Sequence, residues 1–281
     1  MNAELNSDNA ILTHIRPSRG MPSLDMRTLW QYHDLLFFLV WRDIKVRYAQ
    51  SILGIGWAVV QPAIFMIVFT IFFGNLVKIS SDGAPYAVFS YTALVPWTYF
   101  STALVGATGT LVQNSNMLTK IYFPRLYLPA SAIVGRLVDF SIALIMVFAL
   151  MAWFRITPTL WVFALPWFVV LMVITAAGLS MWLAALAVQY RDVIHASTFL
   201  VQLLMYAAPV VYPASVIPDK YRLWYALNPM VGVIEGFRSA LLGTNPMPWD
   251  LLIVGSASAV LVGVGGLIFF RRMEHIFADV V

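Results

Sequence analysis

Long stretches without charge dominate this sequence. Thirty uncharged residues separate Arg47 from Lys78, and 35 separate Arg155 from Arg191. A helix needs roughly 20 mostly apolar residues to cross a bilayer. Only 11% of the 281 residues are charged and 61% are hydrophobic, whereas soluble domains are roughly 25% charged. The sequence therefore predicts an all-α membrane protein, and its composition excludes a soluble enzyme and a disordered chain.

The uncharged stretches divide into six expected membrane-spanning helices within a transmembrane domain at 49–272. The distribution of charge supports this number. With both termini in the cytoplasm, the cytoplasmic parts hold eleven Lys and Arg residues and the outer parts hold five. Cytoplasmic loops carry the excess of these residues, so we expect cytoplasmic tails at 1–28 and 273–281. The expected spans are 52–77, 86–112, 126–154, 160–188, 194–212 and 251–270.

Two segments on the cytoplasmic side have apolar residues but are not spans. In 29–48 the apolar residues recur at steps of three and four among charged ones, which predicts an amphipathic helix in the membrane interface. A basic anchor without a partner is the alternative. Residues 114–123 form a short polar-then-apolar stretch, which predicts a short helix that docks on a soluble protein. A plain connecting loop is the alternative there.

Charged residues three apart occur in two places. Arg136 and Asp139 lie within the third span, where charges are costly; they can neutralise each other on one helix face, or act in gating or interface contact. Glu235 and Arg238 lie in 213–248, a region too polar to span. Asn228 before Pro229 resembles a helix start. This region predicts two short re-entrant helices on the outer side, with an ordinary extracellular loop as the alternative.

The sequence contains no pattern typical of catalysis. It has no Cys, and a nucleotide-binding P-loop needs a Lys after a Gly, which none of its Lys residues provides. A membrane-embedded glycosyltransferase would need clustered carboxylates, but Asp34, Asp43 and Glu235 are dispersed. We therefore expect a transport subunit that is not an enzyme and binds no metal or cofactor of its own.

Four segments, in order, resemble one family. They are 42–62 (Arg-Asp-Ile-Lys-Val-Arg-Tyr-Ala-Gln-Ser-Ile-Leu-Gly-Ile-Gly-Trp-Ala-Val-Val-Gln-Pro), 120–129 (Lys-Ile-Tyr-Phe-Pro-Arg-Leu-Tyr-Leu-Pro), 190–193 (Tyr-Arg-Asp-Val) and 228–238 (Asn-Pro-Met-Val-Gly-Val-Ile-Glu-Gly-Phe-Arg). Together they resemble type-2 ABC exporter permeases, in the branch that exports O-antigen and related polysaccharides. The resemblance extends from about residue 29 to 272.

This resemblance implies a homodimer in the bacterial inner membrane that works with two copies of a cytoplasmic ABC ATPase, which bind the ATP and magnesium. The implied cargo is an undecaprenyl-linked polysaccharide of the O-antigen type. Teichoic acid, capsular polysaccharide or a small lipophilic compound are alternative cargoes. Membrane lipid is the remaining expected partner, and nucleic acid is not expected.

The resemblance also assigns candidate residues to two tasks. The translocation path of the family lies at the dimer interface between helices one, two and five, which implies the channel-lining candidates Trp57, Phe65, Tyr91, Tyr99 and Tyr206. In the family, the loop between spans two and three carries a coupling helix seated on the ATPase. With residues of the interface helix and of the turn before the fifth span, the coupling candidates are Arg42, Asn114, Met117, Leu118, Lys120, Tyr122, Phe123, Tyr190, Arg191 and Asp192.

Overall fold

The computed structural model describes residues 30–120, 123–274 and 277, and these residues form helices without any strand. The helical elements are α2 (His33–Tyr48), η1 (Gly54–Gly56), α3 (Trp57–Phe69), η2 (Thr70–Leu76), α4 (Tyr86–Thr108), α5 (Thr110–Gln113), α6 (Ser115–Lys120), α7 (Tyr127–Trp153), η3 (Leu160–Ala164), α8 (Leu165–Gln189), α9 (Asp192–Tyr206), η4 (Ala214–Val216), α10 (Asp219–Ala226), α11 (Pro229–Leu242) and α12 (Trp249–Met273).

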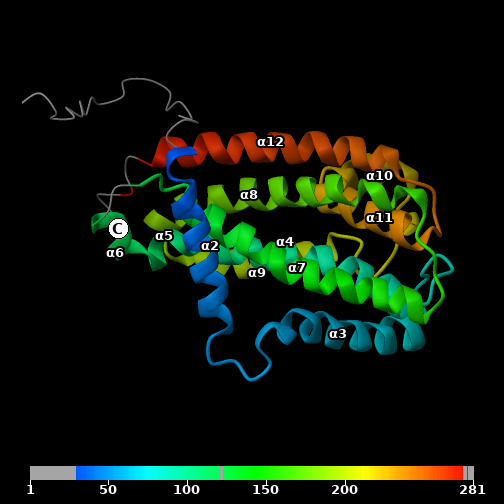
Figure 1. Cartoon of the computed structure of the whole chain (residues 1–281). Helices are drawn as coiled ribbons and strands as arrows, with labels where there is room; N and C mark the ends of the chain where they lie inside the picture. Colours follow the sequence, from blue (N-terminus) through cyan, green and yellow to red (C-terminus); the bar gives the residue numbers. More distant parts are fainter. Residues whose placement is uncertain (1–29, 121–122, 275–276, 278–281) are drawn as a thin grey trace, which may run out of the picture.

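The long helices lie side by side in one bundle. Figure 1 shows α3, α4, α7, α8, α9 and α12 running roughly parallel, with α2 crossing them near one end. The same end holds α5 and α6, and we call it the α6 end. The short helices α10 and α11 lie at the opposite end, which we call the α11 end. The segments expected not to span the membrane therefore gather at the two ends of the bundle.

Four helices of the described chain are long and apolar enough to cross a membrane: Gly54–Leu76, Tyr127–Trp153, Leu160–Gln189 and Trp249–Met273. They coincide with the first, third, fourth and sixth expected spans to within about two or three residues. The fifth expected span is shorter than predicted, because α9 has 15 residues and ends at Tyr206. At 1.5 Å per residue, α9 covers roughly 22 Å.

The second expected span, α4, is long enough at 23 residues but less apolar than these four. It packs against α3, α7, α8, α9 and α11, and most of its residues are buried. Several of its Ser and Thr hydroxyl groups bond to its own backbone; Thr108 Oγ1, for example, donates to the Leu104 carbonyl at 2.7 Å. Protein rather than lipid surrounds α4, so it needs less apolar surface than a peripheral span. The helix ends at Thr108, and the short helix α5 takes the place of the last residues of the expected span.

Glycines allow α8 and α12 to approach closely. A Cβ atom added at Gly266 would lie 2.1 Å from the Gly178 carbonyl oxygen, and one added at Gly178 would lie 2.5 Å from the Val262 carbonyl oxygen. Both distances are too short for any side chain. Small residues at such crossings are typical of helices packed in membranes. This seam packs α12 closely against α8.

A second, smaller core joins the elements of the α6 end. Leu39 of α2, Leu118 of α6 and Phe270 of α12 are buried in it together. The helix α2 begins at His33, and Leu39 is its buried residue. Away from this buried face of α2, Phe37 and Phe38 remain exposed. The expected interface helix therefore has one apolar face on the bundle and a second apolar face outside it.

Candidate functional site

Three adjoining cavities form a groove between α2, α3, α4, α7 and α9. Their volumes are about 220, 430 and 380 Å³. Neighbouring cavities share lining residues, and Arg136 of α7 lines all three. We call this set of cavities the polar groove. It lies on the side of α4 away from α12, towards the α6 end of the bundle.

The lining of the polar groove mixes hydroxyl, amide and aromatic groups. Such a lining suits a ligand rich in hydroxyl groups, because amides and hydroxyls bond to it while aromatic rings pack on its C–H faces. Isolated polar residues inside apolar helices otherwise cost free energy. The hydroxyl and amide residues are Gln61, Thr98, Ser101, Thr102, Thr110, Gln113, Asn114, Thr198 and Gln202, and the aromatic ones are Trp57, Phe65, Trp97 and Phe140, with Tyr48 and Tyr99 supplying both.

One carboxylate, that of Asp139, organises the charged wall of the polar groove. Its Oδ2 atom accepts a hydrogen bond from Arg47 Nη1 at 2.8 Å and another from Arg136 Nη1 at 3.3 Å. The Tyr48 hydroxyl donates to Oδ1 of the same carboxylate. Burial, followed by the bond to Asp139, raises the pKa of Tyr48 to about 12. Tyr48 therefore remains protonated at neutral pH and donates to Asp139.

A second polar contact, a hydrogen bond to an ion-paired carboxylate of α2, also joins α2 to α7. Arg42 Nη2 lies 2.9 Å from Asp43 Oδ1, and the Ser131 hydroxyl of α7 donates to the other Asp43 oxygen at 3.0 Å. Together with the Asp139 contacts, these bonds attach the last two turns of α2 to α7. The interface helix is thus linked to the wall of the groove.

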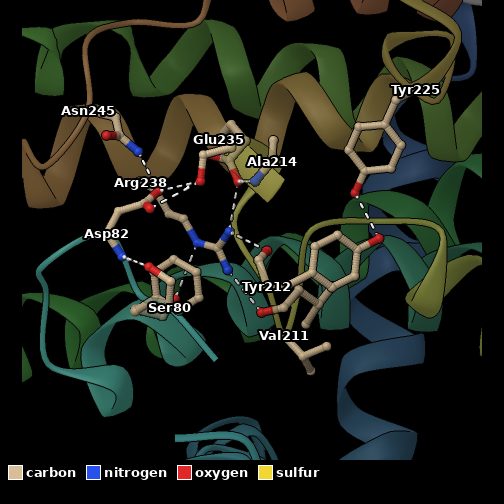
Figure 2. Close-up of polar contacts among 12 residues, drawn as sticks. Ser80, Asp82, Val211, Tyr212, Ala214, Tyr225, Glu235, Arg238 and Asn245 are labelled. Atoms are coloured by element: carbon tan, nitrogen blue, oxygen red, sulfur yellow. Dashed lines mark hydrogen bonds and ion pairs between the residues drawn. The ribbon is translucent and has the colours of Figure 1, made fainter. Parts of the chain in front are cut away.

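At the α11 end, Arg238 lies among bonding partners on every side (Figure 2). Its Nη1 atom donates to Glu235 Oε1 at 2.8 Å, and its Nη2 atom donates to the Val210 carbonyl at 2.9 Å. The guanidinium also lies 3.6 Å from the ring centroid of Phe89. Glu235 accepts a further bond from the Ala214 backbone N–H at 3.1 Å. This pair therefore ties the chain after α9 to α11.

Further polar bonds close the loops at the same end. Asp82 accepts from Asn245 Nδ2 at 2.5 Å and from the Ser215 hydroxyl at 3.1 Å, and the Tyr225 hydroxyl donates to the Tyr212 hydroxyl at 3.1 Å, as seen in Figure 2. The side chain of Asn228 caps α11 by accepting from the Met230 N–H, and Pro229 is the first residue of the helix. The Asn-Pro helix start expected from the sequence is therefore present.

Of the five channel-lining candidates, the structure brings Trp57, Phe65 and Tyr99 into the polar groove. Tyr91 is not among the lining residues. It lies about two turns from Tyr99, nearer the end of α4 that meets the α11 end of the bundle. Packing there leaves its side chain 0% exposed. Tyr206 is also outside the lining: Met205 faces the groove, and the next residue along α9 points to the outside with 69% exposure.

The coupling candidates divide into exposed and buried groups. Lys120, Tyr190, Arg191 and Asp192 are exposed at the α6 end. Leu118 and Phe123 are 7% and 5% exposed because they anchor this end in the second core. Met117 is half-buried against that core. Arg42 and Asn114 line the polar groove instead, and Tyr122 lies outside the described residues.

Reasoning from the sequence missed several groove residues. Arg47 and Tyr48 lie within the segment that carried the family resemblance, but their contact with Asp139 joins residues 92 and 91 positions apart. Gln61 and Gln202 had a usable signal, because an amide within an apolar span is costly unless it has a partner or lines a cavity. Within the part of the chain that the structure describes, no three His, Asp or Glu residues lie close enough to hold a metal ion.

The apolar bundle and its polar groove define an integral membrane transport protein. Residues 34–242 match the family model described as ABC-2 type transporter, and the chain belongs to this family.

Comparisons with individual proteins agree with the family model. The chain is 32% identical to the O-antigen export system permease protein RfbA of Myxococcus xanthus, over 90% of this chain and 98% of the relative. It is 25% identical to a protein of the same description from Klebsiella pneumoniae, over 88% and 95% of the two chains. It is 23% identical to the polysialic acid transport protein KpsM of Escherichia coli, over 72% and 78%.

Proposed function

We propose that this chain is the permease subunit of an ATP-driven exporter of lipid-linked polysaccharide of the O-antigen type. The observation that carries the proposal is the polar groove, whose hydroxyl, amide and aromatic lining runs between apolar helices. A polymer that moves stepwise needs many weak contacts rather than one tight site. The O-antigen export permease of M. xanthus matches nearly the full length of both chains, which supports the same cargo class here.

The proposed topology has six spans in the bacterial inner membrane and both termini in the cytoplasm. In this topology α4 and α9 complete the set formed by the four long apolar helices. The α6 end faces the cytoplasm, and α10 and α11 are the two re-entrant helices on the outer side. The short α9 is compatible with crossing because the chain continues beyond it through Ala207–Val211 before η4 begins.

The proposed assembly contains two copies of the permease and two copies of a cytoplasmic ABC ATPase, which holds the ATP and magnesium. The exposed groups at the α6 end, Lys120, Tyr190, Arg191 and Asp192, are the proposed contacts with that ATPase. Leu118 and Phe123 transmit the movement, because they belong to the same core as Leu39 of α2. In this mechanism, a push on α6 shifts α2 and opens the polar groove at the seam between the two permeases.

Capsular polysaccharide is the second candidate cargo. The similarity to KpsM, a polysialic acid transport protein, extends over 72% of this chain, so the scaffold does not by itself select between the two glycans. Teichoic acid and small lipophilic compounds remain alternatives from the family resemblance, and the hydroxyl and amide lining of the groove favours a polysaccharide over a small lipophilic compound.

The test removes two exposed aromatic rings from the groove. We expect Trp57→Ala combined with Phe65→Ala to lower surface glycan severalfold in cells, measured on polysaccharide gels, while the purified complex keeps its assembly and ATPase rate. Trp167→Ala is the control, because Trp167 is similarly exposed at 53% but lies on α8, outside the groove. Undiminished export by the double variant would contradict the proposed path.

A further inference from the structure

We propose that Arg47 and Arg136 form a binding site for a lipid-borne phosphate group, and that Asp139 holds the position which this phosphate takes. The inference rests on the proposed function, because a polyprenyl lipid carries its glycan through a phosphate or diphosphate. It adds a specific site, with an internal carboxylate as the competing ligand.

The geometry of the two arginines carries the proposal. They come from different helices, α2 and α7, and both donate to one atom, Asp139 Oδ2, at 2.8 and 3.3 Å. Their side chains also line the same two cavities, of about 220 and 380 Å³. Two guanidinium groups that converge on one oxygen beside open space are arranged as they would be around a phosphate oxygen.

Arg136 has unused capacity to bind an anion. A guanidinium has five N–H donors, and among the described residues Arg136 makes a single hydrogen bond, to Asp139. Its side chain is 26% exposed and lines all three cavities of the groove. By contrast, the Arg238 side chain is 4% exposed and bonds to three backbone carbonyls as well as Glu235. Of these two arginines, Arg136 is therefore the one that can accept a new ligand.

The charge around the site also favours an anion. Arg42, Arg47 and Arg136 line the cavity of about 380 Å³ together with Asp43, and Asp139 is the other carboxylate at this wall. Three cations face two anions, so one positive charge is left uncompensated. A phosphate oxyanion supplies the negative charge that balances it, and can bond bidentately to a guanidinium.

Exchange of the ligand would change how α2 is attached to α7. Arg47 lies next to Tyr48 near the end of α2, and both side chains bond to Asp139 of α7. When a phosphate takes the guanidinium groups, Asp139 keeps only its bond from Tyr48. The phosphate then bridges Arg47 of α2 and Arg136 of α7 in place of the carboxylate. Binding of the lipid headgroup is thereby linked to the contact between α7 and the interface helix, which is the element proposed to respond to the ATPase.

The experiment measures binding of farnesyl diphosphate to the purified permease–ATPase complex in detergent. We expect Arg136→Gln to weaken binding about tenfold, as the loss of a charge-assisted hydrogen bond requires, and Arg136→Lys to weaken it less. We expect Asp139→Asn to strengthen binding severalfold, because the competing charge is gone. Lys45→Gln is the matched control: it removes the same charge from α2, but Lys45 does not line the cavities.

Two further probes identify the source of the phosphate. Farnesol, which has no phosphate, should not compete. Phosphatidylglycerol that competes as well as farnesyl diphosphate and depends equally on Arg136 would support the site and identify an ordinary membrane headgroup as its ligand. Equal losses in Arg136→Gln and Lys45→Gln, or unchanged binding in folded Arg136→Gln and Asp139→Asn complexes, would overturn the proposed site.

These outcomes are separable from failure of the proposed function. Arg136-dependent binding in a complex that exports no glycan would contradict the function and leave the phosphate site standing. Loss of export in the Trp57 and Phe65 variant, with farnesyl diphosphate binding independent of Arg136, would do the reverse. The melting temperature of each variant complex shows whether it is folded. Asp139→Asn is expected to change the affinity in the opposite direction from Arg136→Gln, which general unfolding would not do.

Discussion

Two arginine–carboxylate pairs with the same spacing have opposite environments in this molecule. Glu235 and Arg238 lie one helical turn apart on α11 and are enclosed, with side chains 9% and 4% exposed. Arg136 and Asp139 lie one turn apart on α7 beside the polar groove, with side chains 26% and 18% exposed. The first pair has its hydrogen bonds filled by the backbone, and the second pair shares its carboxylate with another helix.

The difference separates a structural role from a ligand-binding role. A buried charge is costly unless its donors and acceptors are paired, and Arg238 meets that condition with Glu235 and three carbonyl groups. Arg136 does not need to meet it, because the groove leaves it partly open. We therefore expect substitutions in the first pair to change the stability of the fold, and substitutions in the second to change ligand binding.

The largest expected effect is that of Arg238→Gln. It leaves Glu235 without its counter-ion and removes bonds to the Val210, Tyr212 and Phe89 carbonyls, so we expect a loss of roughly 3–5 kcal/mol in the free energy of unfolding. Denaturant titration of the permease in detergent measures this loss. Arg136→Gln, one turn from its own carboxylate, should cost less than about 1 kcal/mol. Equal costs for the two would refute the comparison.

Removing the carboxylates tests the same contrast with a smaller effect. Glu235→Gln keeps an oxygen that can accept from the Ala214 N–H but leaves Arg238 buried without its counter-ion, so we expect a loss of about 2 kcal/mol. Asp139→Asn should cost about 1 kcal/mol, since Arg47 and Arg136 reach water in the groove. Denaturant titration of both variants under identical detergent conditions compares their losses in the free energy of unfolding. A larger cost for Asp139→Asn would show that it has the structural role.

The sequence alone predicts the long helices of the bundle well, because an uncharged apolar stretch of about 30 residues is long enough to cross a bilayer as a helix. It also predicts both charge pairs, since residues three apart share a helix face. It does not predict which pair is buried. That property depends on Val210 and Phe89, which come from other elements, and spacing along one helix carries no information about them.

The sequence predicts only part of the polar groove, because its lining also depends on contacts between helices. Trp57, Phe65 and Tyr99 lie where the family resemblance placed a path, but Tyr91 and Tyr206 do not line it. Their position depends on the depth of each residue along its helix and on its exact face, which helix packing decides. Likewise, the turn from α4 into α5 at Gly109 shortens the second expected span. Only the packed structure shows that α4 is enclosed by protein.

The smallest expected effect distinguishes the two ends through single hydroxyl groups. Tyr48→Phe removes the bond to Asp139, and Tyr225→Phe removes the bond to Tyr212. Each should cost about 1 kcal/mol, the usual value of one hydrogen bond. Only Tyr48→Phe, however, removes an attachment of α2 to α7. We therefore expect hydrogen exchange of the α2 amides to increase in Tyr48→Phe and to stay unchanged in Tyr225→Phe, because the latter bond lies at the opposite end of the bundle. Equal protection of α2 in both variants would mean that Arg47, the Ser131–Asp43 bond and the Leu39 packing hold this helix in place without the Tyr48 hydroxyl.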